Sequence, residues 1–206
     1  MREESKFKER ILREIEEDIV KMYSFLLLSA NNNEKIKGKT KFMKELFLIS
    51  KNVPELEYEA DFEAHDYGPH SDYGSDALEE FEVLNLVDTL NGYRLTDLGK
   101  EIAAILKKHI SKDDLEMIED IKQLCNDLNT DEILALVYYT HPEMTVESLV
   151  KDRIDKKRRS IALSLLKKGK VSIGKASEIA GMSMNSFYEM LKERKIKVGM
   201  AYPWKY

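Results

Sequence analysis

The sequence predicts a mainly α-helical protein with one small β-hairpin and two domains. Apolar residues recur at steps of three and four through most of the chain, the spacing that places them on one face of an α-helix. The dipeptide Asn91-Gly92 lies between two short β-type segments and is favoured in hairpin turns, whose central residues need positive φ. Finally, the charge balance changes sign near residue 150, which indicates a domain boundary there.

The composition narrows the class of protein. The chain has 206 residues, of which 43% are hydrophobic and 34% charged, enough for one large domain or two small ones. The apolar stretch Phe25–Leu28 is far shorter than the roughly 20 residues that span a bilayer, and no signal-peptide cleavage pattern follows it. The single cysteine, Cys125, excludes an internal disulfide and a cysteine zinc cluster. We therefore expect a cytoplasmic protein with no membrane segment.

The first two elements are predicted helices. One runs from about Phe7 to Ala30 and ends at Asn31–Asn33, because short polar side chains tolerate left-handed backbone conformations. The next has Thr40 as its expected N-cap, and Pro54 limits its far end.

A third helix and a hairpin follow. In order, we expect a helix capped by Ser71 or Ser75 and ending near Leu84, strands Leu86–Leu90 and Tyr93–Leu95, and a helix capped by Thr96 or Asp97. Three helices and a hairpin are the order of a winged helix-turn-helix. The third helix would be its reading helix, yet it carries four carboxylates that DNA phosphates would repel, at Asp76, Glu79, Glu80 and Glu82. The first domain is therefore expected to bind protein or to mediate dimerisation.

The second half begins with further helices. Apolar spacing predicts helices over about 112–128 and 130–139, and Thr145 is the expected cap of a long helix after them. Residues 151–206 hold 15 Lys and Arg against 5 Asp and Glu, a net charge of +10, whereas residues 1–150 hold 18 against 33, a net of −15. We divide the chain into an acidic winged-helix-like domain, 1–150, and a basic module, 151–206. The asymmetry favours nucleic-acid binding, with a solvated basic surface as the alternative.

The basic module has the spacing of a helix-turn-helix. A short helix, 175–180, is followed by the turn Gly181–Ser183 and a second helix over about 184–194. Ser177 is small enough to let the two helices approach each other, and Ser183 is the expected cap of the second. A small structural helical hairpin is the alternative interpretation.

In such a unit the second helix lies in the major groove of double-stranded DNA. The candidate base-reading residues are Met184, Asn185, Tyr188 and Lys192; the amide of Asn185 suits adenine and Met184 suits a thymine methyl. The candidate phosphate contacts are Lys156, Lys157, Arg158, Arg159, Lys168, Lys170 and Lys175. One small reading helix makes too little contact for specific binding, so we expect a homodimer.

Three segments of this module resemble a known family. They are Lys168–Ala176 (KGKVSIGKA), Glu178–Ser183 (EIAGMS) and Leu191–Arg194 (LKER). They are similar to a small prokaryotic antitoxin-like family whose members read "EGKISLGKAAELAGMS", then an aromatic helix and "LLKERGIPV". That family is often encoded beside PIN-domain ribonucleases, so the resemblance implies an antitoxin or transcriptional regulator with such a toxin as a possible partner. The segment Tyr202–Trp204 is short for an extension that wraps a toxin, which argues against toxin neutralisation.

The first half resembles the YwgA-like and Panacea (SocA-type) winged-helix-like proteins. The similar segments are Gly38–Leu48, Tyr67–Ser71 and the hairpin with Leu95-Thr96. Panacea-type proteins serve as antitoxins or as adaptors that hand clients to proteases. The resemblance thus implies a protein-interaction module, which is the alternative to a DNA-binding regulator.

No motif predicts an enzyme. Gly38-Lys39-Thr40 is similar to the end of a phosphate-binding loop, but the glycine required five positions earlier is Asn33, and a helix precedes in place of a strand. His65, Asp66, His70 and Asp72 form the only metal-like cluster, and we interpret them as turn and capping residues because no third histidine lies near. We expect neither catalysis nor a cofactor or metal; the third alternative, a nuclease or other enzyme, would rest on the His65–Asp72 cluster alone.

Overall fold

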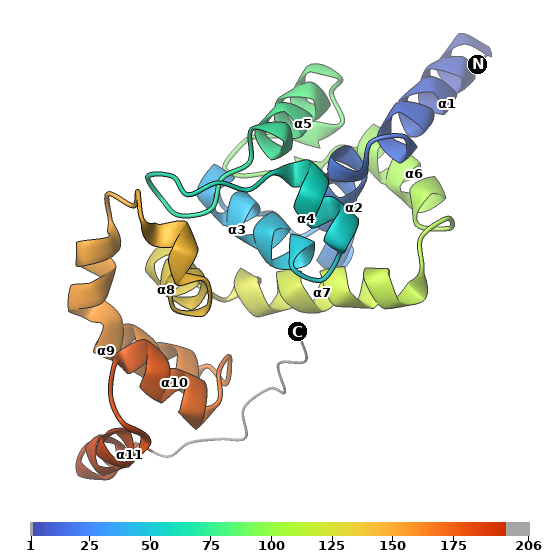
Figure 1. Cartoon of the computed structure of the whole chain (residues 1–206). Helices are drawn as coiled ribbons and strands as arrows, with labels where there is room; N and C mark the ends of the chain where they lie inside the picture. The colour runs from blue at the N-terminus through green and yellow to red at the C-terminus, as the bar shows by residue number, and fades with distance from the viewer. Residues whose placement is uncertain (1, 197–206) are drawn as a thin grey trace. The chain divides into compact units, whose positions relative to one another are not determined.

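The computed structural model describes residues 2–196, which are mainly helical with one two-stranded sheet (Figure 1). The chain forms two compact units. Unit 1 comprises Met1–Glu63 and Pro69–Asn126, and unit 2 comprises Ala64–Gly68 and Asp127–Tyr206. No helix within the described range is both long and apolar enough to cross a membrane.

Unit 1 is built around its second helix. Its elements are α1 (Arg2–Glu16), α2 (Ile19–Asn33), α3 (Lys39–Ser50), α4 (Pro54–Ala60), α5 (Asp72–Val83), β1 (Val87–Asp88), β2 (Arg94–Leu95), α6 (Asp97–Leu106) and α7 (Lys112–Asn126). Helix α2 packs against every other helix of the unit and against β2. Every residue from Tyr23 to Ala30 is buried, so this stretch is the centre of the core.

The predicted single helix over 7–30 is wrong, because the structure breaks it into α1 and α2. The break occurs at Asp18, whose side chain accepts a hydrogen bond from the Lys21 amide at 3.0 Å and so caps α2. The predicted end of this segment is confirmed. Asn31, Asn32 and Asn33 have φ values of 47°, 53° and 61°, the left-handed conformation that asparagine tolerates.

The predicted start and end of α3, at Thr40 and Pro54, both differ in the structure. The N-cap is Gly38, with φ 98°, rather than Thr40, and α3 starts at Lys39. Pro54 does not limit α3, which ends at Ser50; it is the first residue of α4, a helix that the sequence analysis missed. Proline suits that position because the first residues of a helix need no amide donor. The prediction for α5 is confirmed at Ser71, whose hydroxyl accepts from the Gly74 amide at 3.0 Å.

The hairpin is present but shorter than predicted. Val87 lies opposite Leu95, and Asp88 lies opposite Arg94 in an antiparallel pair. Asn91 and Gly92 have φ values of 61° and 120°, the positive values that the turn requires. The loop is longer than two residues, because the pairing ends at Asp88 and Arg94. The Asp88 side chain accepts from the Leu90 amide and from Arg94 within it. The expected cap of α6 is confirmed at Thr96.

The core of unit 1 contains buried charged groups. The ammonium of Lys122 donates to the carbonyls of Leu27, Leu28 and Ala30 at 2.9 to 3.0 Å, and so satisfies the end of α2. Glu45 is also fully buried, and neither of its carboxyl oxygens has a hydrogen-bond partner among the described residues. Burial raises the pKa of Glu45 to about 8, despite the opposing charges of Lys41 and Lys122.

Unit 2 consists of α8 (Thr130–Thr140), the short 3₁₀ helix η1 (Pro142–Thr145), α9 (Lys151–Lys167), α10 (Ile173–Ala180) and α11 (Met184–Glu193). The expected cap at Thr145 is wrong: its hydroxyl donates to the Pro142 carbonyl within η1, and α9 begins at Lys151. Helix α8 packs on α9 and α10. This packing places the division between the units at Asn126, before the point near residue 150 where the charge balance changes.

Candidate nucleic-acid interface

Helices α10 and α11 are joined by a tight turn, and a serine caps each of them. The Ser172 hydroxyl accepts from the Lys175 amide at 3.1 Å, and the Ser183 hydroxyl accepts from the Ser186 amide at 3.2 Å. Gly181 ends α10 in the left-handed conformation with φ 67°, which glycine adopts without a steric cost. The turn predicted at Gly181–Ser183 is therefore confirmed.

Apolar side chains hold the two helices in unit 2. The buried residues of α10 are Ala176, Ser177, Ile179 and Ala180, and those of α11 are Phe187 and Leu191. The Ser177 hydroxyl donates to the Gly174 carbonyl at 2.7 Å, so this polar group is satisfied where the helices pack. One face of α11 is thus fixed against the unit, and the opposite face is exposed.

Arg158 of α9 clamps the end of α10. Its guanidinium donates to the carbonyls of Ile179 at 2.7 Å and Glu178 at 3.0 Å, and it lies over the ring of Tyr139 at 4.4 Å. A Cβ atom at Gly181 would lie 2.6 Å from the guanidinium carbon, so only glycine leaves room for this contact. The structure thus gives Arg158, a predicted phosphate contact, a role inside the unit.

Tyr139 belongs to the same network. Its hydroxyl donates to Asp155, which also accepts from Lys151 at 2.9 Å. Burial and the hydrogen bond to Asp155 both raise the pKa of Tyr139. The network links α8 to α9 and, through Arg158, to the turn before α11.

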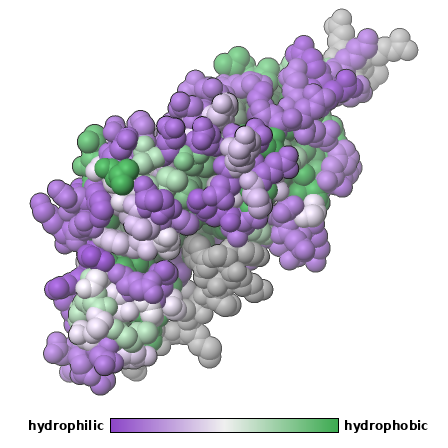
Figure 2. Space-filling model, in the orientation of Figure 1, coloured by the Kyte–Doolittle hydropathy of each residue, from purple (hydrophilic) through white to green (hydrophobic). Residues whose placement is uncertain are grey.

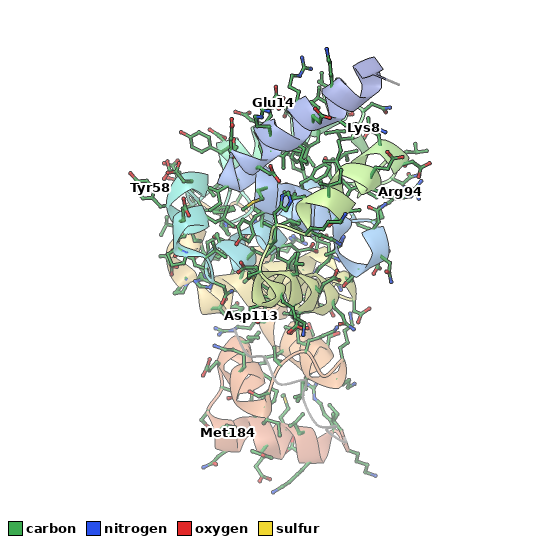
Figure 3. All side chains as sticks on the ribbon, turned by 90° about the vertical axis from the view of Figure 1, so that its right-hand side faces the viewer. Lys8, Glu14, Tyr58, Arg94, Asp113 and Met184 are labelled. Carbon is green, nitrogen blue, oxygen red and sulfur yellow. The ribbon has the colours of Figure 1, made fainter. Side chains whose placement is uncertain are left out.

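The predicted base-reading residues lie on α11. Asn185, Tyr188 and Lys192 are exposed and spaced at three and four residues, so they form one stripe. Met184 stands at the first position of α11 (Figure 3). Its terminal methyl lies 3.4 Å from where a Cβ of Gly174 would be, and the residue is 45% exposed. In Figure 2, hydrophilic and hydrophobic residues are mixed on the surface around the place where Figure 1 labels α11.

One residue of this face escaped the sequence analysis. Glu189 is exposed between Asn185 and Lys192, and its carboxylate lies 2.7 Å from the Lys192 ammonium. The helical spacing alone could have found it, because Glu189 is four residues after Asn185.

Most of the predicted phosphate contacts already have partners within unit 2. The ammonium groups of Lys157 and Lys170 lie 2.9 Å from Asp131 and Asp127, respectively. The Lys168 ammonium lies 2.7 Å from the Glu132 carboxylate, and the Lys175 ammonium lies 2.7 Å from the Glu178 carboxylate. Arg158 is held by the carbonyls at the end of α10. Lys156 and Arg159 are exposed, and their side chains have no hydrogen bond or ion pair with the described residues.

Two of the acidic partners, Asp131 and Glu132, lie in the first turn of α8. Burial by itself raises the pKa of Glu132, but hydrogen bonds from Lys168 and Ser164 outweigh it and hold the pKa below its ordinary value. The pKa of Asp131 is also lowered: burial raises it, but the hydrogen bonds and charges of Lys157 and Arg153 outweigh burial. Because these acidic residues belong to unit 2, residues 127–196 hold 13 Lys and Arg against 10 Asp and Glu, a net charge of only +3.

The metal-like cluster, the carboxylates of α5 and the C-terminal tail are the remaining sequence candidates. No group of three or more His, Cys, Asp or Glu residues within 2–196 could hold a metal ion. Of the four carboxylates of α5, those of Asp76, Glu79 and Glu82 are exposed, but Glu79 is paired with Lys39 at 3.3 Å, and Glu80 is half-buried and paired with Lys21 at 2.6 Å. The tail Tyr202–Trp204 lies outside the described residues.

Comparison with known proteins gives one match. Residues 139–202 match the model of an uncharacterised protein family, UPF0175, and this segment includes α9, α10 and α11. It also contains the segments on which the antitoxin-like resemblance rests. No curated protein and no solved structure is significantly similar to the chain.

Proposed function

We propose that this chain is an antitoxin-like transcriptional regulator that binds double-stranded DNA through α10 and α11 as a helix-turn-helix. The observation that carries the proposal is the geometry of α11. A serine caps the helix, Phe187 and Leu191 anchor one side, and Asn185, Tyr188 and Lys192 form an exposed stripe on the other. A reading helix needs this arrangement, because its outward residues must reach base edges in the major groove. The antitoxin-like role rests on the resemblance of the segments within 168–194, which the uncharacterised family's match also covers.

The ion pairs of unit 2 determine how many of its cations can bind DNA phosphates, and so how much phosphate contacts add to DNA affinity. Lys156 and Arg159 are available to phosphates without breaking a contact, whereas Lys157, Lys168 and Lys170 would exchange a carboxylate for a phosphate. The salt dependence grows with the number of phosphates neutralised, with a slope of about −0.9 for each one. We therefore expect a slope per chain of about −2 to −3, shallower than seven cations would give.

The proposal includes a homodimer and a protein partner. Paired half-sites would supply the contact area that one α11 lacks. Unit 1, in which five helices rather than the predicted three precede the hairpin, would bind a protein or mediate dimerisation. A PIN-domain toxin is the candidate partner that the family resemblance implies. Neither catalysis nor a cofactor is required.

Fluorescence anisotropy tests this proposal. The full-length chain is titrated with labelled duplex from its own upstream region and with a scrambled duplex, at several salt concentrations. We expect tighter binding of the native duplex and loss of that preference in Asn185→Ala. The matched contrast is the double variant Lys156→Ala/Arg159→Ala. It should weaken the binding of both duplexes by the same factor and make the dependence of binding on salt less steep. Equal and weak binding of both duplexes by the wild type would refute DNA reading.

A protein-interaction module, an antitoxin or a protease adaptor, is the second candidate function. The exposed carboxylates of α5 favour it, since they suit a basic protein surface better than DNA. Its distinguishing result is a tight one-to-one complex with the product of a neighbouring gene, unaffected by Asn185→Ala.

A further inference from the structure

The centre of the exposed face of α11 is a carboxylate. Glu189 is two residues from Phe187 and two from Leu191, the buried anchors, and therefore lies about 160° around the helix from each of them. Its side chain is 66% exposed. Asn185 and Lys192 flank it at spacings of four and three, so the three polar groups form one continuous surface.

A carboxylate has few acceptable partners in DNA. It only accepts hydrogen bonds when ionised, so it is repelled by phosphates and by the O6 and N7 acceptors of guanine. The donors in the major groove are the amino groups of cytosine and adenine, and cytosine is the usual partner of glutamate. Lys192 supplies the complementary chemistry, because its ammonium donates to guanine acceptors.

We propose that Glu189 and Lys192 together read one C·G base pair, next to the A·T pair that Asn185 reads. The 2.7 Å contact between carboxylate and ammonium holds an acceptor and a donor side by side. A C·G pair presents the matching donor and acceptors side by side across the major groove. This inference rests on the proposed DNA-binding function and makes Glu189 its determinant of specificity.

The Glu189–Lys192 pair adds too little helix stability to explain a carboxylate at the centre of the exposed face. An exposed pair at a spacing of three stabilises a helix by only about 0.2–0.5 kcal/mol. Glu193 is also exposed on α11, but no ion pair or hydrogen bond within the described chain engages its side chain. It lies one turn beyond Glu189 and, unlike Lys192, makes no contact that directs its side chain back toward Glu189 and the end of α11 that enters the groove. Glu193 is therefore the matched control for a carboxylate that adds only charge.

The test uses the native upstream duplex and the set of its single-base-pair variants, each titrated with wild type, Glu189→Gln and Glu193→Gln. We expect the wild type to lose about tenfold in affinity when one particular C·G pair is replaced by A·T. Glutamine pairs with adenine, so Glu189→Gln should reverse the preference at that pair alone. Lys192→Met should reduce discrimination at the same pair, and Glu193→Gln should leave every preference as in the wild type.

The outcomes separate this inference from the proposed function. A wild type that distinguishes the native duplex, together with a Glu189→Gln variant that binds every duplex more tightly by one common factor, would overturn the reading role and leave DNA binding intact. A wild type with no preference among any of the duplexes would overturn the proposed function, and the inference with it.

Discussion

The buried carboxyl of Glu45 makes the stability of unit 1 depend on pH. The pKa of Glu45 in the folded chain is about 8, against an ordinary value of 4.5, chiefly because burial disfavours the charged form. Between these values the folded chain keeps a proton that the unfolded chain releases. Stabilisation by this proton is therefore complete below about pH 4.5 and is lost as the pH rises to about 8.

The substitution Glu45→Gln removes this titration and keeps the shape of the side chain. The loss amounts to about 1.4 kcal/mol for each pH unit, so from about pH 5 to about pH 6.5 the wild type should lose about 2 kcal/mol relative to the variant. Lys122, with a lowered pKa of about 8, stays protonated in this window, and Lys44, with a lowered pKa of about 7, is present in both proteins, so its contribution cancels in the comparison.

Urea unfolding followed by circular dichroism measures the difference at each pH. Other titrating groups are common to both proteins, so subtraction isolates Glu45. The control is Glu59→Gln, the same chemical change at an exposed position of α4. A free-energy difference between wild type and Glu45→Gln that stays constant across the window would show that Glu45 is already ionised in the folded chain.

Three further substitutions test the contacts described above. Lys122→Met should lower the urea midpoint of unit 1 and cost about 3 kcal/mol, because three buried carbonyls lose their donor; a cost below about 1 kcal/mol would contradict this role. Gly181→Ala should destabilise unit 2 by about 1–3 kcal/mol and so lower its thermal midpoint, through the positive φ and the clash with Arg158; an unchanged midpoint would show that the turn adapts. Ser183→Ala should cost about 1 kcal/mol in the same assay, whereas Ser160→Ala on α9 should have little effect.

The features predicted correctly from the sequence are those fixed by neighbouring residues. Asn91-Gly92 forms its turn, and Ser71, Thr96 and Ser183 cap their helices, because each interaction spans only a few positions. The exposed stripe of α11 was likewise predictable, since it follows from the helical period alone.

The errors and omissions depend on contacts that a local pattern does not contain. Lys122 and Glu45 resemble surface residues in the sequence, yet both are fully buried, and Lys122 satisfies carbonyls more than 90 positions earlier. The break at Asp18 was hidden because apolar residues continue at helical spacing on both sides of it. Asp18 itself is the one local signal that could have revealed the break, as a capping residue inside a charged stretch.

The charge asymmetry is the most instructive case, because it supported DNA binding for a reason that the fold weakens. Arg153, Lys157 and Lys168 hydrogen-bond to acidic residues or carbonyls located 22 to 41 positions earlier. Those residues fall on the acidic side of residue 150 in the sequence but within unit 2 in the structure. Some of the cations that make up the +10 charge of residues 151–206 are therefore used in holding the start of α8 against α9. Because phosphate contacts carry no sequence information, the case for a regulator depends on the outward face of α11, where Asn185, Glu189 and Lys192 lie together.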